Sequence, residues 1–392
     1  MKVLFAHDHI FKESEGLFYS SGGLPRSVWE RYTSVFGDLT VVGRDGGCIA
    51  DSDKGFVLSS AGAVSFTLLP NIVNIKSFMF GSRAVRTKVR TLVEEHDALI
   101  ARMPSRIAAM MIKEAVAQGK PYLVEVVGCP WDSLRTYGGW KAKIFAPYAC
   151  VEMKFLLRRA KFALYVTSSF LQGRYPAAGI ANVVACSDVE VSTVSDELIE
   201  SRILRINERL PNDLVVFGLV GNYSSKYKGI DVAIKALAKS NARNWRLRIL
   251  GGGDASTYLG LADHLGVSDK VEFVGRLPSG KAVQEWLDTV DIYLHPSLTE
   301  GMPRALIEAM SRGCPALASD AGGIPELLGP EEISRAGDVA LLVDIINSLI
   351  SDKDRQVSLV TRNHSVAQCY LKGELDSRRS RFFQEFKNSF SV

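Results

Sequence analysis

The chain has 392 residues, of which 47% are apolar and 23% charged, and its formal net charge is +4. A charge this small does not by itself indicate a nucleic-acid-binding protein. The length exceeds the size at which a single hydrophobic core usually stops growing, so two domains are expected.

The cysteines and the N-terminus indicate a cytoplasmic protein. Six cysteines are scattered along the chain without a C-x-x-C pair, and no histidine cluster has zinc spacing, which is typical of reduced thiols. No apolar run approaches the roughly 18 residues that span a bilayer. The N-terminus, MKVLFAHDHI, has four apolar residues before His7, so we expect a first strand that ends at His7-Asp8-His9, and not a signal peptide.

In the first half of the chain, apolar runs of strand length alternate with segments of helical period. This alternation is typical of parallel βα units. The expected strands lie near 3–6, 39–43, 64–69, 98–102, 122–127 and 162–167. The expected helices lie near 25–36, 77–95, 105–118, 140–160 and 169–175.

A polar stretch at 187–213 interrupts this pattern and is the candidate linker. The alternation then restarts, with strands expected at 214–220, 246–250, 271–274, 292–295 and 315–319 and helices at 229–240, 256–265, 281–290, 303–312, 323–328, 336–351 and 355–371. We therefore predict an α/β chain of two doubly wound, parallel-sheet domains that face each other across a cleft. The predicted boundaries are 1–190 for the first domain, 191–213 for the linker, 214–371 for the second domain and 372–392 for a tail helix that packs back on the first.

The most informative segment is 291–328, DIYLHPSLTEGMPRALIEAMSRGCPALASDAGGIPELL. It predicts a buried strand followed by a helix, in which Pro303 suits the first turn and Gly313 the stop. Glu300 would lie in the loop at the strand's carboxyl end and Glu308 about five residues into the helix. Ligands of open parallel sheets bind at this edge. Two carboxylates there are good acceptors for sugar or ribose hydroxyls.

A second segment, 214–237, predicts a strand, a glycine-containing loop and a helix, with Lys226 and Lys228 just before the helix. It has neither the P-loop pattern nor G-x-G-x-x-G, so it supports neither Walker nor dinucleotide chemistry. Loop amides, a helix N-terminus and two ammonium groups can hold a diphosphate without a metal ion.

Taken together, residues 214–328 resemble the nucleotide-binding domain of the family-four retaining glycosyltransferases, also known as glycosyl transferases group 1, which have the GT-B architecture of two Rossmann-like domains. The resemblance is carried by YKG at 227–229, LGGG at 250–253, FVGRL at 273–277, HPSLTEGMPRALIEAM at 295–310 and AGGIPELL at 321–328. SGGLPRSV at 21–28, ARMPS at 101–105 and YLVEVVGCPWDSL at 122–134 resemble that family's acceptor domain more loosely.

The resemblance implies roles for particular residues. Glu300 would hold hydroxyls of the transferred sugar, Glu308 the ribose, and Lys228 the diphosphate, with Lys226 in place of an arginine that many members have where this chain has Asn222. The donor site would also include Gly22, Gly23, Gly221, Gly301, Met302, Pro303 and Arg304, and the candidates for lining the cleft are His7, His9, Arg102, Gly128 and His295. Where many members have His-Gly, this chain has Val127-Gly128, which puts a mechanism resting on that histidine in doubt.

The expected activity is hexosyl transfer, with retention, from a nucleotide-diphosphate sugar to a glycan or polyprenyl-linked saccharide, in cell-surface polysaccharide synthesis and with neither metal nor other cofactor. Two alternatives stay open, a nucleotide-sugar epimerase of the same architecture and a catalytically idle partner subunit. Asp51-Ser52-Asp53 matches the D-x-D metal motif, but it is interpreted as a plain turn because no buried strand delivers it.

Two basic, aromatic segments raise a membrane contact as an open question. Segment 137–162 mixes Trp, Phe, Leu and Met with six Lys and Arg residues, and segment 377–390 places four phenylalanines on one helical face. Such helices can lie on an anionic membrane surface. Packing on the first domain is the preferred interpretation for the tail, whereas the two readings are balanced for 137–162. The expected localisation is therefore cytoplasmic, with peripheral contact at the inner face of the plasma membrane left open.

Overall fold

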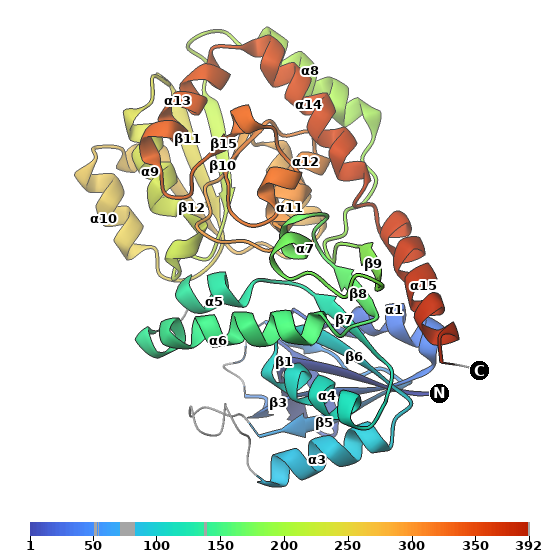
Figure 1. Ribbon diagram of the computed structural model, residues 1–392. Coiled ribbons are helices and arrows are strands. Elements are labelled where there is room, and N and C mark those ends of the chain that lie inside the picture. The colour runs from blue at the N-terminus through green and yellow to red at the C-terminus, as the bar shows by residue number, and fades with distance from the viewer. Residues whose placement is uncertain (51–52, 54, 71–82, 137–138, 391–392) are drawn as a thin grey trace. The chain divides into compact units, whose positions relative to one another are not determined.

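The computed structural model describes residues 1–50, 53, 55–70, 83–136 and 139–390. The chain divides into two compact units, Met1–Trp131 with Ile144–Cys186 and Asp376–Val392, and Asp132–Lys143 with Ser187–Leu375. Each unit contains a mainly parallel sheet flanked by helices (Figure 1). The predicted α/β class with two parallel-sheet domains is confirmed.

The sheet of the first unit is built around the long strand β1 (Lys2–Ser14). Its parallel strands have the order β5-β3-β1-β6-β7-β8-β9. They are β3 (Asp38–Cys48), β5 (Val64–Leu69), β6 (Ala98–Met103), β7 (Tyr122–Val126), β8 (Phe162–Tyr165) and β9 (Asn182–Ala185). Strand β2 (Leu17–Ser20) pairs antiparallel with the C-terminal part of β1, and β4 (Val57–Leu58) pairs antiparallel with β2. The strand order reverses between β1 and β6.

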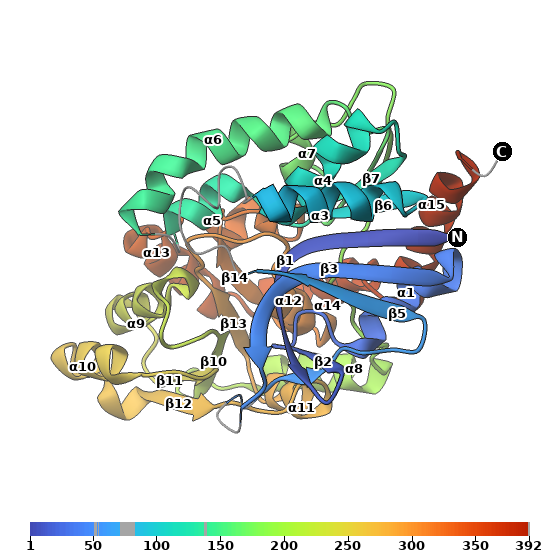
Figure 2. The ribbon, with the colours of Figure 1, turned by 90° about the horizontal axis from the view of Figure 1, so that it is seen from below.

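Helices cover both faces of this sheet. They are α1 (Arg26–Phe36), α3 (Arg83–Glu94), α4 (Arg106–Ala117), α6 (Trp140–Leu157) from Ile144 onward, α7 (Phe170–Arg174) and α15 (Lys372–Asn388) from Asp376 onward. Most of α5 (Pro130–Thr136) and the first turn of α6 group with the second unit. Figure 2 shows α3, α4 and α6 on the same side of β1, β3 and β5. The predicted start of α3 at 77 falls outside the described residues.

The C-terminal helix α15 packs on the first unit through its phenylalanines. Phe383 stacks on Tyr32 of α1, with 5.4 Å between the ring centroids, and Phe386 contacts Phe36 and Phe162. Phe383 and Phe386 are almost completely buried, so these aromatic side chains are part of the core and do not form a free surface.

The second unit has a six-stranded parallel sheet in the order β12-β11-β10-β13-β14-β15. The strands are β10 (Val215–Val220), β11 (Trp245–Leu250), β12 (Val271–Gly275), β13 (Ile292–His295), β14 (Ala316–Ser319) and β15 (Ile333–Ser334). This is the Rossmann order 3-2-1-4-5-6, in which the strand order reverses between β10 and β13.

Two separate hydrophobic cores cover the faces of this sheet. One contains α9 (Ile230–Lys239), α10 (Ser256–His264) and α13 (Val339–Ile350), and the other α11 (Lys281–Asp288), α12 (Arg304–Ser311) and α14 (Lys353–Gln368). Strand β13 contributes side chains to both cores, because successive side chains of a strand point to opposite faces of the sheet. Ile292 and Leu294 enter the first core and Tyr293 the second.

The stretch predicted as a linker differs in the structure. It contains helix α8 (Asp196–Glu208), which belongs to the second unit. The reason is Arg202, which is buried and donates hydrogen bonds to the backbone carbonyls of Leu287, Val290 and Arg312. From the sequence alone an arginine in a polar stretch is expected to be solvent-exposed, because its hydrogen bonds to distant backbone carbonyls are not visible there. Segment Asp132–Lys143 likewise groups with the second unit, although the sequence placed it in the first domain.

Candidate active site

The topology of the second unit brings its predicted site residues to one edge of the sheet. Strands β10 and β13 are neighbours, and their connections to the next strand run in opposite directions. At such a switch point the two loops separate and leave room for a ligand. The short 3₁₀ helix η1 (Lys226–Lys228) follows β10, and Glu300 follows β13.

Lys228 and Glu300 meet at this point. The Lys228 ammonium nitrogen donates to Oε1 of Glu300 at 2.6 Å, and Nε2 of His295 lies 2.8 Å from the same oxygen. The two charged side chains are 17% and 9% exposed, so the pair is largely shielded from water. Within the described residues, Oε2 of Glu300 has no recorded hydrogen bond, which leaves one carboxylate oxygen available to a ligand.

Electrostatics keeps this cluster in a defined protonation state. Burial alone would raise the pKa of Glu300, but His295 and Lys228 hold it well below the usual value for a glutamate. Burial lowers the pKa of His295, so its ring is neutral at pH 7. A neutral ring that donates from Nε2 to Glu300 accepts at Nδ1, and the Tyr293 hydroxyl lies 3.4 Å from Nδ1.

Glu308 stands in a different environment. It is half-buried in α12, and within the described residues its carboxylate has no recorded hydrogen-bond partner. Burial raises its pKa, and the charge of Arg304 only partly offsets this effect. A half-buried carboxylate without a partner is costly, which is typical of a group that awaits a ligand.

Three glycines allow the loops to approach the cluster closely. A Cβ atom at Gly221 would lie 2.9 Å from Cβ of Lys228, and one at Gly229 would lie 2.0 Å from the backbone oxygen of Pro296. At Gly322, where φ is +60°, a Cβ atom would lie 2.1 Å from the backbone oxygen of Glu300. Gly322 and Tyr293 are site residues that the sequence analysis missed. The alternation of β13 would have placed Tyr293 on the same side as His295.

The remaining residues predicted in this unit lie on the same loops. Lys226 is exposed, with no recorded partner in the described parts of the chain, whereas the Asn222 side chain accepts a hydrogen bond from the backbone of Ser224. Gly301, Met302, Pro303 and Arg304 lead from Glu300 into α12, and Pro303 caps that helix. The structure therefore brings Lys228, His295 and Glu300 into contact and places the others in adjoining positions.

The predicted residues of the first unit gather around its own switch point. Strand β1 pairs with β6 up to Ala6, so His7 follows this pairing directly and Arg102 lies opposite it. Nδ1 of His7 lies 3.1 Å from the backbone oxygen of Arg102, and a Cβ atom at Gly23 would touch the ring of His9. Gly128 follows β7 and is close to Pro104, whereas Gly22 has open space around it.

Strand β1 does not end at His7-Asp8-His9 as predicted, but continues to Ser14. The extension is stabilised by pairing with β2 and β3, which the sequence analysis did not foresee. Asp8 accepts hydrogen bonds from the backbone nitrogens of Arg106 and Ile107 and so caps α4.

His7 and His9 are neutral at pH 7. Burial and, next, the charge of Arg102 lower the pKa of each ring to about 4. The Ser20 hydroxyl accepts a hydrogen bond from the backbone nitrogen of Leu24 and lies 2.7 Å from Nε2 of His9. Arg102 is itself paired with the buried Glu125 at 3.2 Å.

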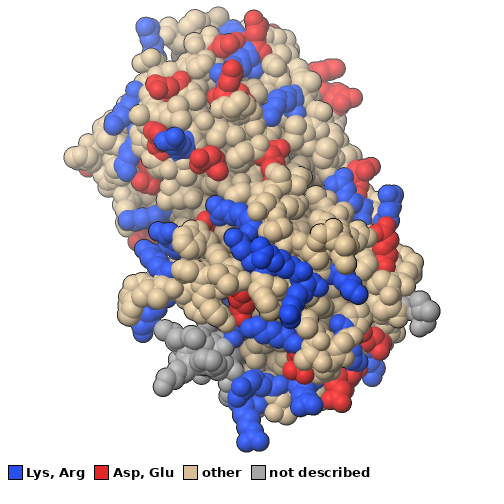
Figure 3. Space-filling model, in the orientation of Figure 1, with Lys and Arg blue, Asp and Glu red and all other residues tan. Residues whose placement is uncertain are grey.

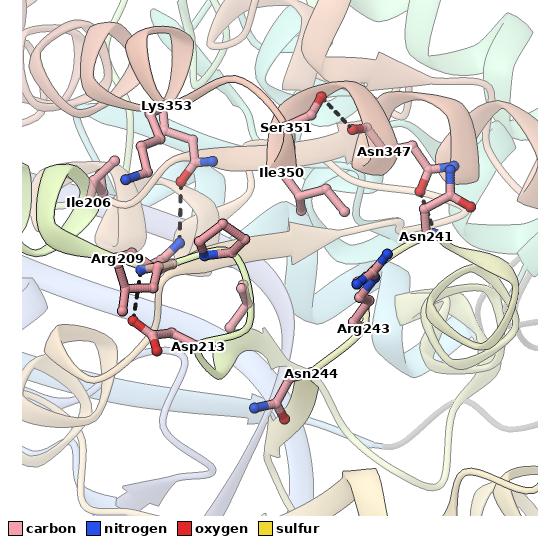
Figure 4. A pocket seen from close by; sticks show the side chains of 15 residues that line it. Ile206, Arg209, Asp213, Asn241, Arg243, Asn244, Asn347, Ile350, Ser351 and Lys353 are labelled. Atoms are coloured by element: carbon pink, nitrogen blue, oxygen red, sulfur yellow. Dashed lines mark hydrogen bonds between the residues drawn. The ribbon is translucent and has the colours of Figure 1, made fainter.

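The second unit also has a pocket away from these residues. A pocket of about 530 Å³ lies at the amino ends of β10 and β11, at the edge opposite Lys228 and Glu300. Figure 4 shows Arg209, Arg243 and Lys353 among its lining residues. Arg209 pairs with Asp291 and Lys353 donates to the backbone of Asn207, so most of this polar lining already has partners. The acid and base side chains predicted for the site converge instead at the carboxyl edge.

The described part of the chain contains no group of three or more His, Cys, Asp or Glu side chains placed to hold a metal ion. Asp53 pairs with Lys12 at 2.7 Å, whereas Asp51 and Ser52 lie outside the described residues. Of the helices described, none is long and apolar enough to cross a membrane.

Known proteins resemble this chain over part or all of its length. Protein CapJ of Staphylococcus aureus is 28% identical over 395 residues, which cover 99% of this chain and 96% of CapJ. The amylovoran biosynthesis glycosyltransferase AmsK of Erwinia amylovora is 40% identical over 110 residues, or 26% of this chain and 27% of AmsK.

Solved structures share the fold. Sucrose-phosphate synthase from Thermosynechococcus elongatus aligns with a TM-score of 0.68 at 16% identity, over 99% of this chain and 100% of its own. Anabaena Alr3699/HepE, solved in complex with UDP, aligns with a TM-score of 0.67 at 17% identity over 100% of both chains. The sequence profile described as Glycosyl transferases group 1 matches residues 201–365. This part of the chain is similar to the glycosyl transferases group 1 family, and the protein is a glycosyltransferase with the GT-B fold.

Proposed function

We propose that the protein is a retaining, metal-independent glycosyltransferase that moves a hexose-type sugar from a nucleotide-diphosphate sugar to a glycan or polyprenyl-linked saccharide. The observation that carries this proposal is the contact of Lys228, His295 and Glu300 at the switch point of the second unit. A cation beside a carboxylate with one free oxygen suits a ligand that has both a diphosphate and sugar hydroxyls.

In this reaction the diphosphate leaving group gains negative charge as its bond to the anomeric carbon breaks. A cation about 4 Å away stabilises a unit charge by roughly 4 kcal/mol at an effective dielectric constant near 20. This corresponds to about a thousandfold in rate. Lys228 has the position for this role, and the exposed Lys226 adds a second positive charge in the same 3₁₀ turn.

The carboxylates bind hydroxyl groups. Glu300 is ionised at neutral pH and uses one oxygen for Lys228 and His295, so its other oxygen would accept from a hydroxyl of the transferred sugar. Glu308 would accept from the ribose, which would supply the partner that its carboxylate lacks. We assign no covalent nucleophile, and we propose front-face attack in which the leaving phosphate helps to deprotonate the acceptor.

The names of two similar proteins guide the choice of substrates. AmsK is described as an amylovoran biosynthesis glycosyltransferase, which supports a role in cell-surface polysaccharide synthesis. The structure of HepE was also solved in complex with UDP-glucose, so UDP-glucose is the first donor to test. A cytoplasmic location, where nucleotide sugars are made, completes the proposal.

A donor panel tests this function. Thermal-shift measurements with UDP, GDP, ADP and their sugars should show a stabilising ligand, and the matching sugar nucleotide should be hydrolysed slowly in the presence of EDTA. NMR of the released sugar or transfer product should show retention at the anomeric carbon. Binding without turnover would indicate an idle partner subunit, whereas a rearranged nucleotide sugar without transfer would indicate an epimerase. Activity that EDTA abolishes and a divalent cation restores would contradict the metal-independent mechanism.

A further inference from the structure

Helix α6 is apolar on two opposite sides. Its inner side buries Ala146, Met153, Leu156 and Leu157. Its outer side exposes five apolar residues, Trp140 at 69%, Ile144 at 71%, Tyr148 at 41%, Val151 at 67% and Phe155 at 51%. At 100° per residue these five fall within an arc of about 80°, roughly opposite the buried side.

This arrangement is unusual for exposed apolar residues. Single exposed apolar side chains are normal on a protein surface, but a continuous stripe on one helix marks an interaction site. The other exposed apolar residues described in the first unit lie on separate elements, among them Leu17, Val57 and Ile180. The α6 stripe therefore requires an explanation that scattered exposure does not.

Basic residues predominate around the stripe, and its one acidic neighbour on α6 is Glu152, which accepts a hydrogen bond from the Tyr148 hydroxyl at 3.1 Å. Lys141 and Lys143 lie in the first turn of α6, and Lys154, Arg158 and Arg159 lie at its end. On the helical wheel these cations lie among the stripe residues or along both margins of the stripe. Figure 3 shows Lys and Arg gathered in a band on this face of the molecule, next to a surface with few charges.

The acid of α6 does not oppose these cations. Glu152 binds Arg106 of α4 at 2.7 Å and Lys113 of α4 at 2.5 Å, so its charge is neutralised on the side that faces α4. At the outer side, the Arg159 guanidinium lies 4.5 Å from the centroid of the Phe155 ring. Aromatic residues paired with cations are typical of side chains that lie at a membrane–water interface.

We propose that this outer face of α6 docks the protein on an anionic phospholipid surface. A helix with a narrow apolar stripe flanked by Lys and Arg lies in the plane of the interface, with its apolar side chains at the headgroup boundary. Each basic residue close to an anionic surface raises the affinity about fivefold. The contact is independent of the transfer reaction, but it would place the enzyme where a lipid-linked acceptor is found.

Vesicle sedimentation with the full-length protein tests the apolar part of this contact. At low salt the protein should bind vesicles of equal parts phosphatidylglycerol and phosphatidylcholine and should bind pure phosphatidylcholine much more weakly. The triple variant Ile144→Ser/Val151→Ser/Phe155→Ser should bind the anionic vesicles at least tenfold more weakly. The matched control, Ile180→Ser/Leu204→Ser/Leu259→Ser, removes three exposed apolar residues elsewhere and should bind normally.

A second variant tests the charges. Lys154→Glu/Arg158→Glu/Arg159→Glu should lose affinity for the anionic vesicles by at least about a hundredfold, because removal of the three cations alone gives three factors of about five. Lys239→Glu/Arg243→Glu/Arg246→Glu makes the same change in net charge at exposed positions of the second unit and should lose much less.

Four outcomes decide the inference. Absence of vesicle binding by the unaltered protein at low salt would overturn it, as would equal losses in the variants and their controls. If the unaltered protein self-associates through α6 and does not bind vesicles, the stripe is a dimer interface and the proposal is wrong. Hydrolysis of the donor in solution should be unchanged in the α6 variants, so failure of the membrane contact and failure of the proposed transfer activity are separate results.

Discussion

Replacing Lys228 by methionine removes the charge at the centre of the site and keeps most of the side-chain length. The Lys228 nitrogen lies 2.6 Å from Glu300, and both side chains are mostly shielded from solvent. If this nitrogen lies about 4 Å from the leaving diphosphate, its loss costs roughly 4 kcal/mol of transition-state stabilisation at a dielectric constant near 20. We expect kcat to fall by at least a hundredfold, with an upper value near a thousandfold.

The same variant has a predictable effect on stability. Without Lys228, the Glu300 carboxylate keeps only the hydrogen bond from His295, and burial then raises its pKa. Breaking a fully buried pair costs about 3–5 kcal/mol, but this carboxylate keeps one donor and can take up a proton. We therefore expect the free energy of unfolding to fall by only about 1–2 kcal/mol, which leaves a folded protein for assay.

Initial rates of donor hydrolysis, together with urea unfolding curves, measure both effects. Lys226→Met is the matched control because it removes the same charge from the same 3₁₀ turn at an exposed position. An exposed cation is screened by solvent, so the control should lose about tenfold or less in kcat. If folded Lys228→Met turned over at a near-normal rate, Lys228 would have no part in stabilising the leaving group, and the reasoning would be refuted.

Three further variants probe other parts of the structure. Glu308→Gln should weaken nucleotide binding by about 1.5–3 kcal/mol, as measured by calorimetry. The melting temperature should stay unchanged or rise, because the substitution removes a half-buried charge. A lower melting temperature would contradict this reasoning. Gly322→Ala should lower the free energy of unfolding by about 1–3 kcal/mol and the activity together, because its Cβ atom would meet the Glu300 backbone at a φ of +60°. His9 has a pKa of about 4 when folded and about 6.5 when unfolded, so between pH 7 and pH 5 only the unfolded chain takes up a proton and stability should fall by about 2 kcal/mol. His9→Gln should flatten this pH dependence in urea titrations, and an unchanged slope would show that His9 is not its source.

The sequence predicted much of the second unit because its signals are local. The run around β13 and α12 contains a strand, a turn, a proline at the helix start and a glycine at its stop, and each acts within a few residues. The family resemblance implies that Lys228 and Glu300 bind the same donor, and strand order explains why residues 72 positions apart meet. His295 is predicted only as a candidate for lining the cleft, and the three-dimensional arrangement shows its bond to Glu300.

Other features depend on long-range contacts that no local pattern encodes. Strands β2, β4 and β9 are short, and they form because a neighbouring strand offers an open edge. The interior role of Arg202 in α8 depends on carbonyls more than 80 residues away in sequence. Helix α6 has apolar residues on both its inner and outer sides, so its pattern alone could not separate a core helix from a membrane-binding one.

The two units use the same topology but place different charges at their switch points. In the first unit Arg102 pairs with Glu125, and the rings of His7 and His9 stay uncharged at pH 7. In the second unit Lys228 and Lys226 add positive charge beside two carboxylates. A diphosphate needs compensating cations, whereas a saccharide hydroxyl needs only neutral donors and acceptors. Under the proposed function, this difference in charge would place the diphosphate of the donor on the second unit and an uncharged acceptor group on the first.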